Sequence, residues 1–236
     1  MALVTGAGRR VGRAIALELG RAGAQVVVHY NASRGGADET AAMIVHAGGR
    51  AYVAQADLTD PAAPDRLIAE AIDAAGRLDI LVNSAAVMER TPIGEVTVEA
   101  WEAMFSLNLR APFFLSQAAA PRLAEGGVIV NIADLAAFET WPAYIPHSIT
   151  KAGIVQLTRA LARALAPRIR VNAVAPGAVQ LPDDWDADSA RRLASTTPLG
   201  RLGSADDVAQ AVRYLIEAGY VTGEVLIVDG GRHVRV

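Results

Sequence analysis

Three side chains that can take part in proton transfer lie along one stretch of the sequence, at Asp134, His147 and Lys151. Residues four apart share one face of a helix, so His147 and Lys151 should point into the same cleft. Imidazole titrates near neutral pH and is a common general acid or base, which makes His147 a candidate proton donor. An ammonium nearby disfavours imidazolium and a carboxylate favours it, so these two neighbours act on His147 in opposite directions.

Lys151 is also singled out by composition. The chain has 22 lysine and arginine residues, and Lys151 is the one lysine among them. Arginine serves elsewhere, so the retained ammonium, which is compact and responsive to its surroundings, is a functional candidate.

Tyr144 is a second candidate proton donor, seven residues before Lys151. Pro146 suits the first turn of a helix and disfavours helical geometry at Ile145. We therefore expect Tyr144 just upstream of the helix, lining a substrate pocket. The sequence leaves three possibilities open: His147 donates the proton, Tyr144 donates it, or the chain has no competent donor.

A glycine-rich turn at residues 5–12 lies between the first apolar segment and the first helical segment. Glycines let backbone N–H groups approach a pyrophosphate, which then lies at the positive end of the following helix. The spacing is Gly-x-Gly-x-x-x-Gly, not the tighter Gly-x-Gly-x-x-Gly fingerprint. In this context the turn predicts a dinucleotide site, with Gly6, Arg9, Arg10, Val11 and Gly12 as candidate cofactor-binding residues.

The residues around this turn favour NADP(H) over NAD(H). Arg9 and Arg10 can grip a 2′-phosphate through paired hydrogen bonds. NAD sites instead carry an acidic residue at the end of the second strand, and here the first acid is Asp38. The residues at that strand end, and further candidate cofactor contacts, are Tyr30, Asn31, Ala32 and Ser33.

Apolar runs of strand length alternate along the chain with segments whose apolar residues recur every three or four positions. The strand-like runs cover residues 2–5, 26–30, 51–55, 80–83, 128–132, 169–175 and 225–228. The helical segments cover residues 12–22, 37–47, 62–75, 98–123, 146–166 and 205–218. This alternation predicts an α/β fold with a parallel, doubly wound sheet and helices on both faces, of the Rossmann type.

No linker divides the sequence, so residues 1–236 are expected to form one domain. Residues 176–204 are the longest stretch without a clear element. A loop of that length in a compact domain is usually functional, so we expect this segment to bind substrate.

Composition excludes several classes of protein. Apolar residues make up 52% and charged residues 20%, which excludes global disorder. The chain has no cysteine and a net charge of −3, so thiolate chemistry is absent and nucleic acid is not an expected partner. No apolar run reaches the roughly 18 residues of a membrane span. The histidines other than His147 are scattered along the sequence, without the spacing of metal ligands. We expect a cytoplasmic protein with a small-molecule substrate, no membrane association and no metal site.

Six spaced motifs follow one another in the sequence. They are the turn at 5–12, Asp57-Leu58, Asn83-Ser84-Ala85-Ala86, Asn108, Pro176-Gly177 and Val228-Asp229-Gly230-Gly231. Together they resemble the short-chain dehydrogenase/reductase family over essentially all 236 residues. Ser84 and Ala86 depart from the family's Asn-Asn-Ala-Gly motif.

The resemblance implies a seven-stranded sheet in the order 3-2-1-4-5-6-7 and hydride transfer with a nicotinamide cofactor. It implies that Asn108 supports a proton-relay water and that Lys151 holds the ribose. The further cofactor contacts that it implies are Asp57, Leu58, Asn83, Ala85, Pro176, Gly177 and Val179. It also implies a homotetramer, or a homodimer, built on the segments 98–123 and 146–166.

The sequence departs from the family at the catalytic helix. Family members carry Tyr-x-x-x-Lys, and His147 stands where the tyrosine would be. Asp134 lies thirteen residues earlier, where the pteridine reductases of the family carry an aspartate, and Arg10 and residues 29–33 also resemble those NADPH-dependent members. The enoyl reductases of the superfamily use Tyr-x-x-Met-x-x-x-Lys, and Tyr144 and Lys151 have that spacing.

The leading hypothesis is an NADP(H)-dependent oxidoreductase acting on a carbonyl, alcohol or pterin-like C=N bond. Pterin, a 3-oxoacyl thioester, a sugar and a xenobiotic ketone all remain possible substrates. The alternative is an NADP-binding protein without turnover, a sensor or interaction module, and the substitution at His147 is its sole support.

Overall fold

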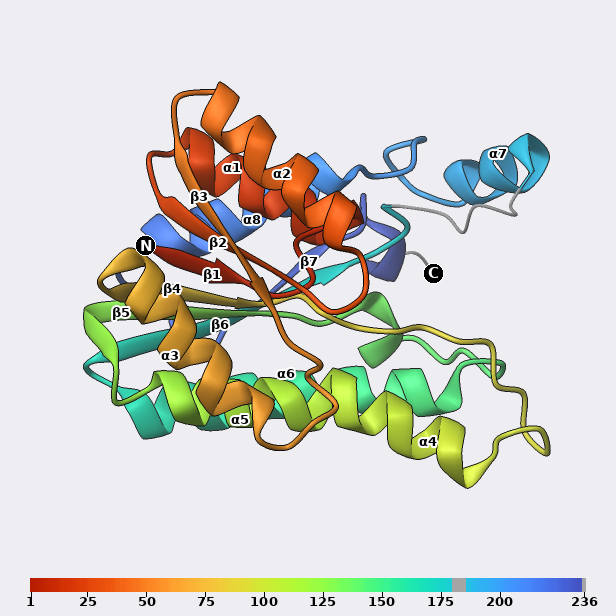
Figure 1. Cartoon of the computed structure of the whole chain (residues 1–236). Coiled ribbons are helices and arrows are strands. Elements are labelled where there is room, and N and C mark those ends of the chain that lie inside the picture. The colour runs from red at the N-terminus through yellow and green to blue at the C-terminus, as the bar shows by residue number, and fades with distance from the viewer. Residues whose placement is uncertain (180–185, 235–236) are drawn as a thin grey trace.

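A computed structural model describes residues 1–179 and 186–234 of the chain. Its seven strands are parallel and form one sheet in the order β3-β2-β1-β4-β5-β6-β7 (Figure 1). The strands are β1 (Ala2–Val4), β2 (Gln25–Tyr30), β3 (Arg50–Gln55), β4 (Leu78–Asn83), β5 (Leu123–Ile132), β6 (Ile169–Pro176) and β7 (Val225–Val228). The predicted doubly wound α/β fold and its strand order are confirmed.

Helices cover both faces of this sheet. The α-helices among the described residues are α1 (Arg10–Arg21), α2 (Arg34–His46), α3 (Ala63–Ala75), α4 (Val98–Phe105), α5 (Ala111–Ala119), α6 (Ile145–Leu165), α7 (Ala187–Ser195) and α8 (Ala205–Glu217). A π-helical turn, η1 (Ser106–Arg110), and two short 3-10 turns, η2 (Leu135–Ala137) and η3 (Arg232–Val234), complete the set. Helices α1, α2 and α8 lie on one face, and α3, α5 and α6 lie on the other (Figure 1).

The central strands are buried on both sides, which is why their sequences are continuously apolar. In β1, Ala2 and Val4 pack into the core beneath α1 and α8, while Leu3 packs into the core on the opposite face. Val27 and its neighbours in β2 alternate in the same way. Successive side chains of a strand point to opposite faces, so a sheet covered twice needs no polar positions in its middle.

Two expectations need correction. The single helix expected over 98–123 is instead α4, the π-turn η1 and α5, and the chain has entered β5 by Leu123. Pro112 has no N–H to continue an α-helical hydrogen-bond ladder, which accounts for the irregular turn before it. The segment 176–204 also contains a helix, α7, whose N-cap Asp186 accepts a hydrogen bond from the backbone of Ser189. Residues 180–185 of that segment lie outside the described residues.

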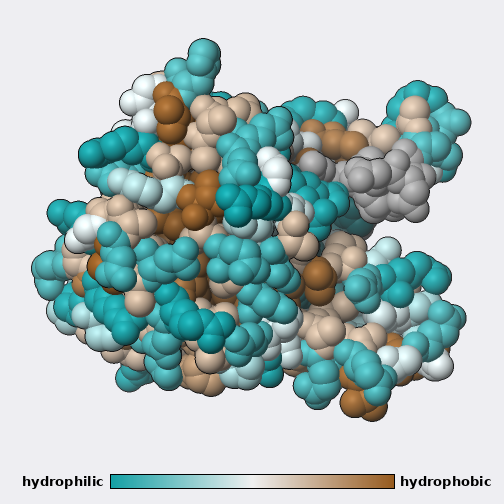
Figure 2. Space-filling view, viewed as in Figure 1, coloured by the Kyte–Doolittle hydropathy of each residue, from teal (hydrophilic) through white to brown (hydrophobic). Residues whose placement is uncertain are grey.

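The loops that follow β1, β2, β4, β5 and β6 meet at the carboxyl edge of the sheet, where doubly wound folds bind their ligands. The space-filling view shows this edge of the molecule hollowed between the part that carries α7 and the part that carries α4 (Figure 2). Within residues 1–179 and 186–234, no helix is both long enough and apolar enough to cross a membrane.

Candidate active site

Helix α6 presents the two central residues of the candidate site. It begins at Ile145, with Tyr144 as its N-cap and Pro146 in its first turn, as the proline predicts. His147 and Lys151 lie one turn apart and are 2% and 4% exposed. Their shared face is therefore turned into the protein and not toward bulk solvent.

Asp134 approaches this face from the end of β5. Its Oδ2 lies 3.6 Å from Nε2 of His147, while its Oδ1 accepts a hydrogen bond of 2.8 Å from the Ala136 backbone and so caps η2. The cap fixes the carboxylate beside the imidazole. The structure thus brings together Asp134 and His147, which the family resemblance implies as neighbours.

Lys151 is held by a main-chain acceptor. Its Nζ donates a hydrogen bond of 2.9 Å to the carbonyl oxygen of Ile132, the last residue of β5. Burial lowers the pKa of Lys151, and the charge of Asp134 partly opposes that effect. An ammonium has three N–H donors, so two remain for a ligand.

Asn108 lies in the π-turn η1, and its amide grips the backbone of Val87. Its Nδ2 donates to the Val87 carbonyl oxygen at 2.8 Å, and its Oδ1 accepts from the Val87 N–H at 2.9 Å. The same carbonyl oxygen lies 3.3 Å from Nδ1 of His147. The side chain expected to support a relay water therefore also contacts the peptide beside the candidate proton donor.

Tyr144 lies at the rim of this arrangement. Its ring packs edge-to-face on Trp141 with centroids 6.2 Å apart, and its backbone pairs with Thr91 in the loop after β4. It lies just upstream of the helix, as Pro146 predicts, and it is half-buried.

The glycine turn has the close contacts that a nucleotide cradle needs. Gly6 has a φ of +65° and packs against Ala85, and a Cβ on Gly12 would lie 2.3 Å from the Gly6 carbonyl oxygen. Neither position can carry a side chain, so the backbone is exposed to close approach. Arg9, the N-cap of α1, gives no side-chain cap to that helix. The first-turn amides of α1 can therefore receive phosphate oxygens, and the turn fits a dinucleotide.

The comparisons with known proteins agree with this arrangement. A sequence family described as enoyl-(acyl carrier protein) reductase matches residues 6–233. An uncharacterized oxidoreductase of Methylorubrum extorquens is 40% identical, over 98% of this chain and 96% of the relative. A 3-oxoacyl-[acyl-carrier-protein] reductase of Synechocystis is 36% identical, over 98% and 96%. A crystal structure of a dehydrogenase/reductase from Sinorhizobium meliloti superposes with a TM-score of 0.93 at 38% identity, covering 98% of this chain and 94% of that one.

The chain belongs to the short-chain dehydrogenase/reductase family. It is thus an oxidoreductase of the type that acts on carbonyl or alcohol substrates with a nicotinamide cofactor. His147 is the position at which this chain departs from the family's Tyr-x-x-x-Lys pattern.

The remaining cofactor candidates of this short-chain dehydrogenase/reductase all lie at the carboxyl edge of the sheet. Tyr30 ends β2, and Ser33 is the N-cap of α2. Pro176 ends β6, and Gly177 packs so closely on Asp229 that a Cβ would lie 2.7 Å from the Asp229 Cβ. The others follow strands β2, β3, β4 and β6, namely Asn31, Ala32, Asp57, Leu58, Ala85 and Val179.

Two of the predicted contacts can act only through their backbone, or only indirectly. Leu58 is buried with its side chain in the core beneath α3. The Asn83 amide nitrogen donates to the side chains of Asn131 and Ser116, so it ties β4 to β5 and α5. Asp57 binds the backbone and hydroxyl of Thr59 through one oxygen, which leaves its other oxygen for a ligand.

Two residues that hold the glycine turn were not predicted from the sequence. His29 accepts a hydrogen bond of 3.1 Å from the Gly6 N–H at Nδ1, and its Nε2 lies 3.0 Å from the Ala56 carbonyl oxygen. Arg13 donates to the Gly8 carbonyl oxygen and to Glu39 of α2. A polar residue inside the apolar strand β2 was the available signal for His29. Arg13 had none, because an arginine near a helix start resembles a solvated one.

Proposed function

We propose that this protein is an NADP(H)-dependent oxidoreductase that uses His147, in place of the family's tyrosine, to exchange the proton with a carbonyl or alcohol substrate. The observation that carries the proposal is the buried cluster at the start of α6, where Asp134 lies 3.6 Å from Nε2 of His147 one turn before Lys151. The glycine turn that fits a dinucleotide lies at the same edge of the sheet.

The chemistry assigned to each residue follows from its contacts. When bound, the cofactor supplies or accepts the hydride. In the reductive direction, an imidazolium His147 gives the Nε2 proton to the substrate oxygen, and Asp134, fixed by its bond to the Ala136 backbone, lies beside that nitrogen. In the oxidative direction, neutral His147 takes the hydroxyl proton at Nε2. Lys151, already bound to Ile132, uses its remaining donors to hold the ribose.

NADP(H) is the proposed cofactor because positive groups surround the adenosine end of the turn. Arg9 and Arg10 lie at the start of α1, and Ser33 gives α2 no side-chain cap, so the positive end of that helix also faces this region. Asp38, the first acid after β2, pairs with Arg34 at 3.4 Å. A 2′-phosphate suits these groups better than an unmodified ribose.

The proposed substrate carries a carbonyl or alcohol group, and a pterin-like C=N bond is the second candidate. Asp134 and Arg10 support the likeness to pteridine reductases, while the relatives reported above include a 3-oxoacyl reductase. The segment 176–204, which includes α7, is the proposed substrate loop. A cytoplasmic location stays a prediction from the sequence.

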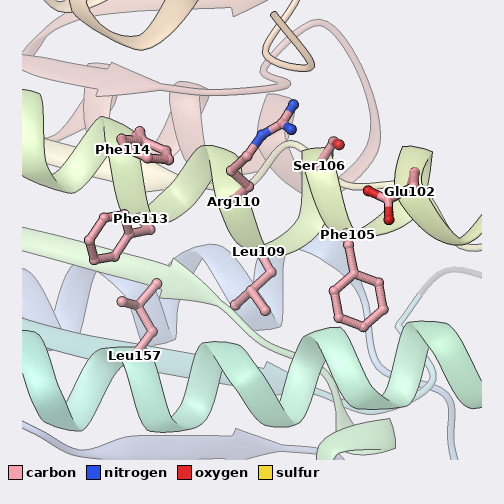
Figure 3. Close-up of a pocket in the computed structure, with 8 residues that line it drawn as sticks. All are labelled: Glu102, Phe105, Ser106, Leu109, Arg110, Phe113, Phe114 and Leu157. Atoms are coloured by element: carbon pink, nitrogen blue, oxygen red, sulfur yellow. The ribbon is translucent and has the colours of Figure 1, made fainter. Parts of the chain in front are cut away.

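A homotetramer or homodimer belongs to the same proposal. A groove of about 310 Å³ runs between η1, α5 and α6, and Figure 3 shows Phe105, Leu109 and Phe113 on one wall facing Leu157 on the other. Phe113 and the adjacent Phe114 are 41% and 38% exposed. A second copy of this chain would cover these rings. Light scattering should therefore give an oligomer for the wild type and a smaller species for Phe113→Glu.

The decisive experiment is a screen of NADPH oxidation over carbonyl and pterin substrates, with NADPH and NADH binding measured in parallel. Turnover of one substrate class with tighter binding of NADPH supports the proposal. Tight binding without turnover of any substrate favours the alternative, an NADP-binding protein that acts as a sensor. In that case His147→Tyr would restore the family's constellation, and activity gained by this variant would locate the defect at His147.

A further inference from the structure

The contacts of the His147 ring distinguish its two nitrogens. Nδ1 lies 3.3 Å from the carbonyl oxygen of Val87, and a carbonyl oxygen only accepts, so this contact requires a hydrogen on Nδ1. Nε2 has no hydrogen-bond partner among the described residues. Its 3.6 Å separation from Asp134 Oδ2 is too long for a hydrogen bond. Nε2 is therefore the nitrogen left for a substrate.

The position of the Val87 carbonyl depends on Asn108. The amide of Asn108 binds both polar groups of residue 87, donating to its carbonyl oxygen at 2.8 Å and accepting from its N–H at 2.9 Å. An amide nitrogen cannot accept and an amide oxygen cannot donate, so the two bonds fix the orientation of the side chain. Val87, in the loop after β4, is thereby held against η1.

The same amide also reaches the helix turn that carries His147. Nδ2 of Asn108 lies 3.3 Å from Oγ1 of Thr150, and that hydroxyl donates to the His147 carbonyl oxygen at 2.7 Å. The contacts form a closed ring that runs from Asn108 through Val87, His147 and Thr150 back to Asn108. All three side chains in this ring are buried.

We propose that Asn108 is a positioning residue that selects the tautomer of His147: through the Val87 carbonyl it keeps the hydrogen on Nδ1 and leaves Nε2 as the reacting nitrogen. The consequence for proton transfer rests on the proposed function, whereas the tautomer itself does not. In oxidation, the lone pair of Nε2 takes the hydroxyl proton of the substrate while hydride leaves to the nicotinamide. In reduction, Nε2 of the imidazolium gives its proton to the substrate oxygen, and the ring returns to the Nδ1–H form.

His29 provides an internal reference of the opposite tautomer. Its Nδ1 accepts from the Gly6 N–H, so its hydrogen must be on Nε2, which lies 3.0 Å from the Ala56 carbonyl oxygen. The chain has four histidines in all. Two buried rings in one protein are thus expected to give opposite signatures in the same spectrum.

The direct test is ¹⁵N NMR of the full-length protein labelled at histidine, recorded at alkaline pH without added ligand. Two-bond couplings between ring nitrogens and carbon-bound protons identify which nitrogen carries the hydrogen. We expect Nδ1–H for His147 and Nε2–H for His29. An Nε2–H signature for wild-type His147 would overturn the proposal, whatever the activity of the enzyme.

Variants of Asn108 test the cause. Asn108→Ala removes both bonds to Val87, and Asn108→Asp keeps the size but cannot donate to the Val87 carbonyl. Both should turn His147 into a mixture of tautomers and lower kcat about 10- to 100-fold, by analogy with partners that orient metal-bound histidines. The KM for NADPH should change little. If Asn108→Ala does not fold, Asn108→Asp still tests whether Asn108 sets the tautomer of His147.

Asn172 supplies a matched control. It is another buried asparagine whose side chain donates to one main-chain carbonyl, that of Val221, and accepts from one main-chain N–H, that of Glu224. Asn172→Ala should lose comparable stability and leave both the His147 tautomer and kcat unchanged. A pure Nδ1–H ring in Asn108→Asp would contradict the assigned cause. Full turnover in His147→Ala, by contrast, would remove the proposed function and leave the tautomer result standing.

Discussion

His29, the β2 histidine that holds the glycine turn, and His147, at the start of α6, are each 2% exposed, and the two rings are used in opposite ways. Both nitrogens of His29 are engaged, by Gly6 and Ala56, and burial lowers its pKa to about 4. His147 has only Nδ1 engaged, and its Nε2 faces Asp134 without a hydrogen bond. A histidine ring with both nitrogens hydrogen-bonded holds the backbone around it in place. A buried ring nitrogen without a hydrogen-bond partner, beside a carboxylate, is instead available for proton transfer.

The polar residues around the two histidines differ in hydrogen bonding in the same way. At the turn, the hydroxyl of Thr5 accepts from the backbone of Ser84 and Ala85, in addition to the bonds made by His29 and Arg13. Near the start of α6, among the described residues, Thr91 Oγ1, His147 Nε2 and Ser148 Oγ are buried without a hydrogen-bond partner. An unpaired buried polar atom is costly, so a cluster of them favours a site where a ligand supplies the missing partners.

Replacing His147 should give the largest effect. His147→Ala should lower the rate of carbonyl reduction by roughly 10²- to 10⁴-fold, the range of a lost general acid, with NADPH affinity nearly unchanged. Wild-type reduction should be faster at acidic than at alkaline pH, because only imidazolium carries a proton on Nε2.

Tyr144→Phe is the comparison variant for that experiment. If Tyr144 is the donor, it carries the large loss and His147→Ala is mild. Rates and pH profiles of the two variants on one accepted substrate separate the cases. An unaltered rate and profile in His147→Ala would remove His147 from the mechanism.

The variant Lys151→Arg tests whether a positive charge alone, without the ammonium group, supports turnover. The buried ammonium binds the Ile132 carbonyl, and a guanidinium is larger and planar, so it cannot keep that bond and the same ribose geometry. The variant should fold and lose most of its turnover. Full activity in a folded Lys151→Arg protein would make the single lysine a coincidence of composition.

These residues show what the sequence could predict. Helical spacing and the single lysine predict a role for His147 and Lys151, apolar runs predict the strands, and the resemblance to a family implies Asp134 and the strand order. The Val87 carbonyl could not be found, because every residue has one and only the folded loop places it beside an imidazole. The π-turn around Asn108 was likewise not predicted, although Pro112, which cannot continue an α-helical hydrogen-bond ladder, was a local signal for a break in the helix.

His29 makes the glycine turn sensitive to acid. Its pKa is about 4 in the folded chain against 6.5 for the free side chain, so between these values the unfolded chain binds more protons. The stabilisation is complete above pH 6.5 and is lost as pH falls through about 4, a change of about 3 kcal/mol in unfolding free energy. Urea unfolding of the wild type and of His29→Gln over this range measures it.

His46 is the matched control for that measurement, since it is exposed near the end of α2. His46→Asn should retain the wild-type dependence of stability on pH. His29→Gln should be less stable at neutral pH, and its stability should fall less steeply in acid. Identical slopes for His29→Gln and the wild type would show that other groups cause the acid sensitivity.

The smallest expected effect concerns Arg10, whose φ of +53° lies in the left-handed region that favours glycine. A residue other than glycine in this region costs about 1–2 kcal/mol, and a cation at a helix start opposes the helix dipole. Such strain persists where the side chain is needed. Arg10→Gly should therefore raise the unfolding free energy by about 1 kcal/mol and narrow the preference for NADPH over NADH by roughly 1–3 kcal/mol.

Arg9 separates the two parts of this prediction, because its φ of −159° is ordinary extended backbone. Arg9→Ala also removes one positive charge from the turn, but it relieves no strain. We expect it to weaken NADPH binding without the gain in stability. Thermal unfolding and nucleotide titrations of both variants measure the difference, and equal affinities of the wild-type protein for NADPH and NADH would remove the functional reason for the strained arginine.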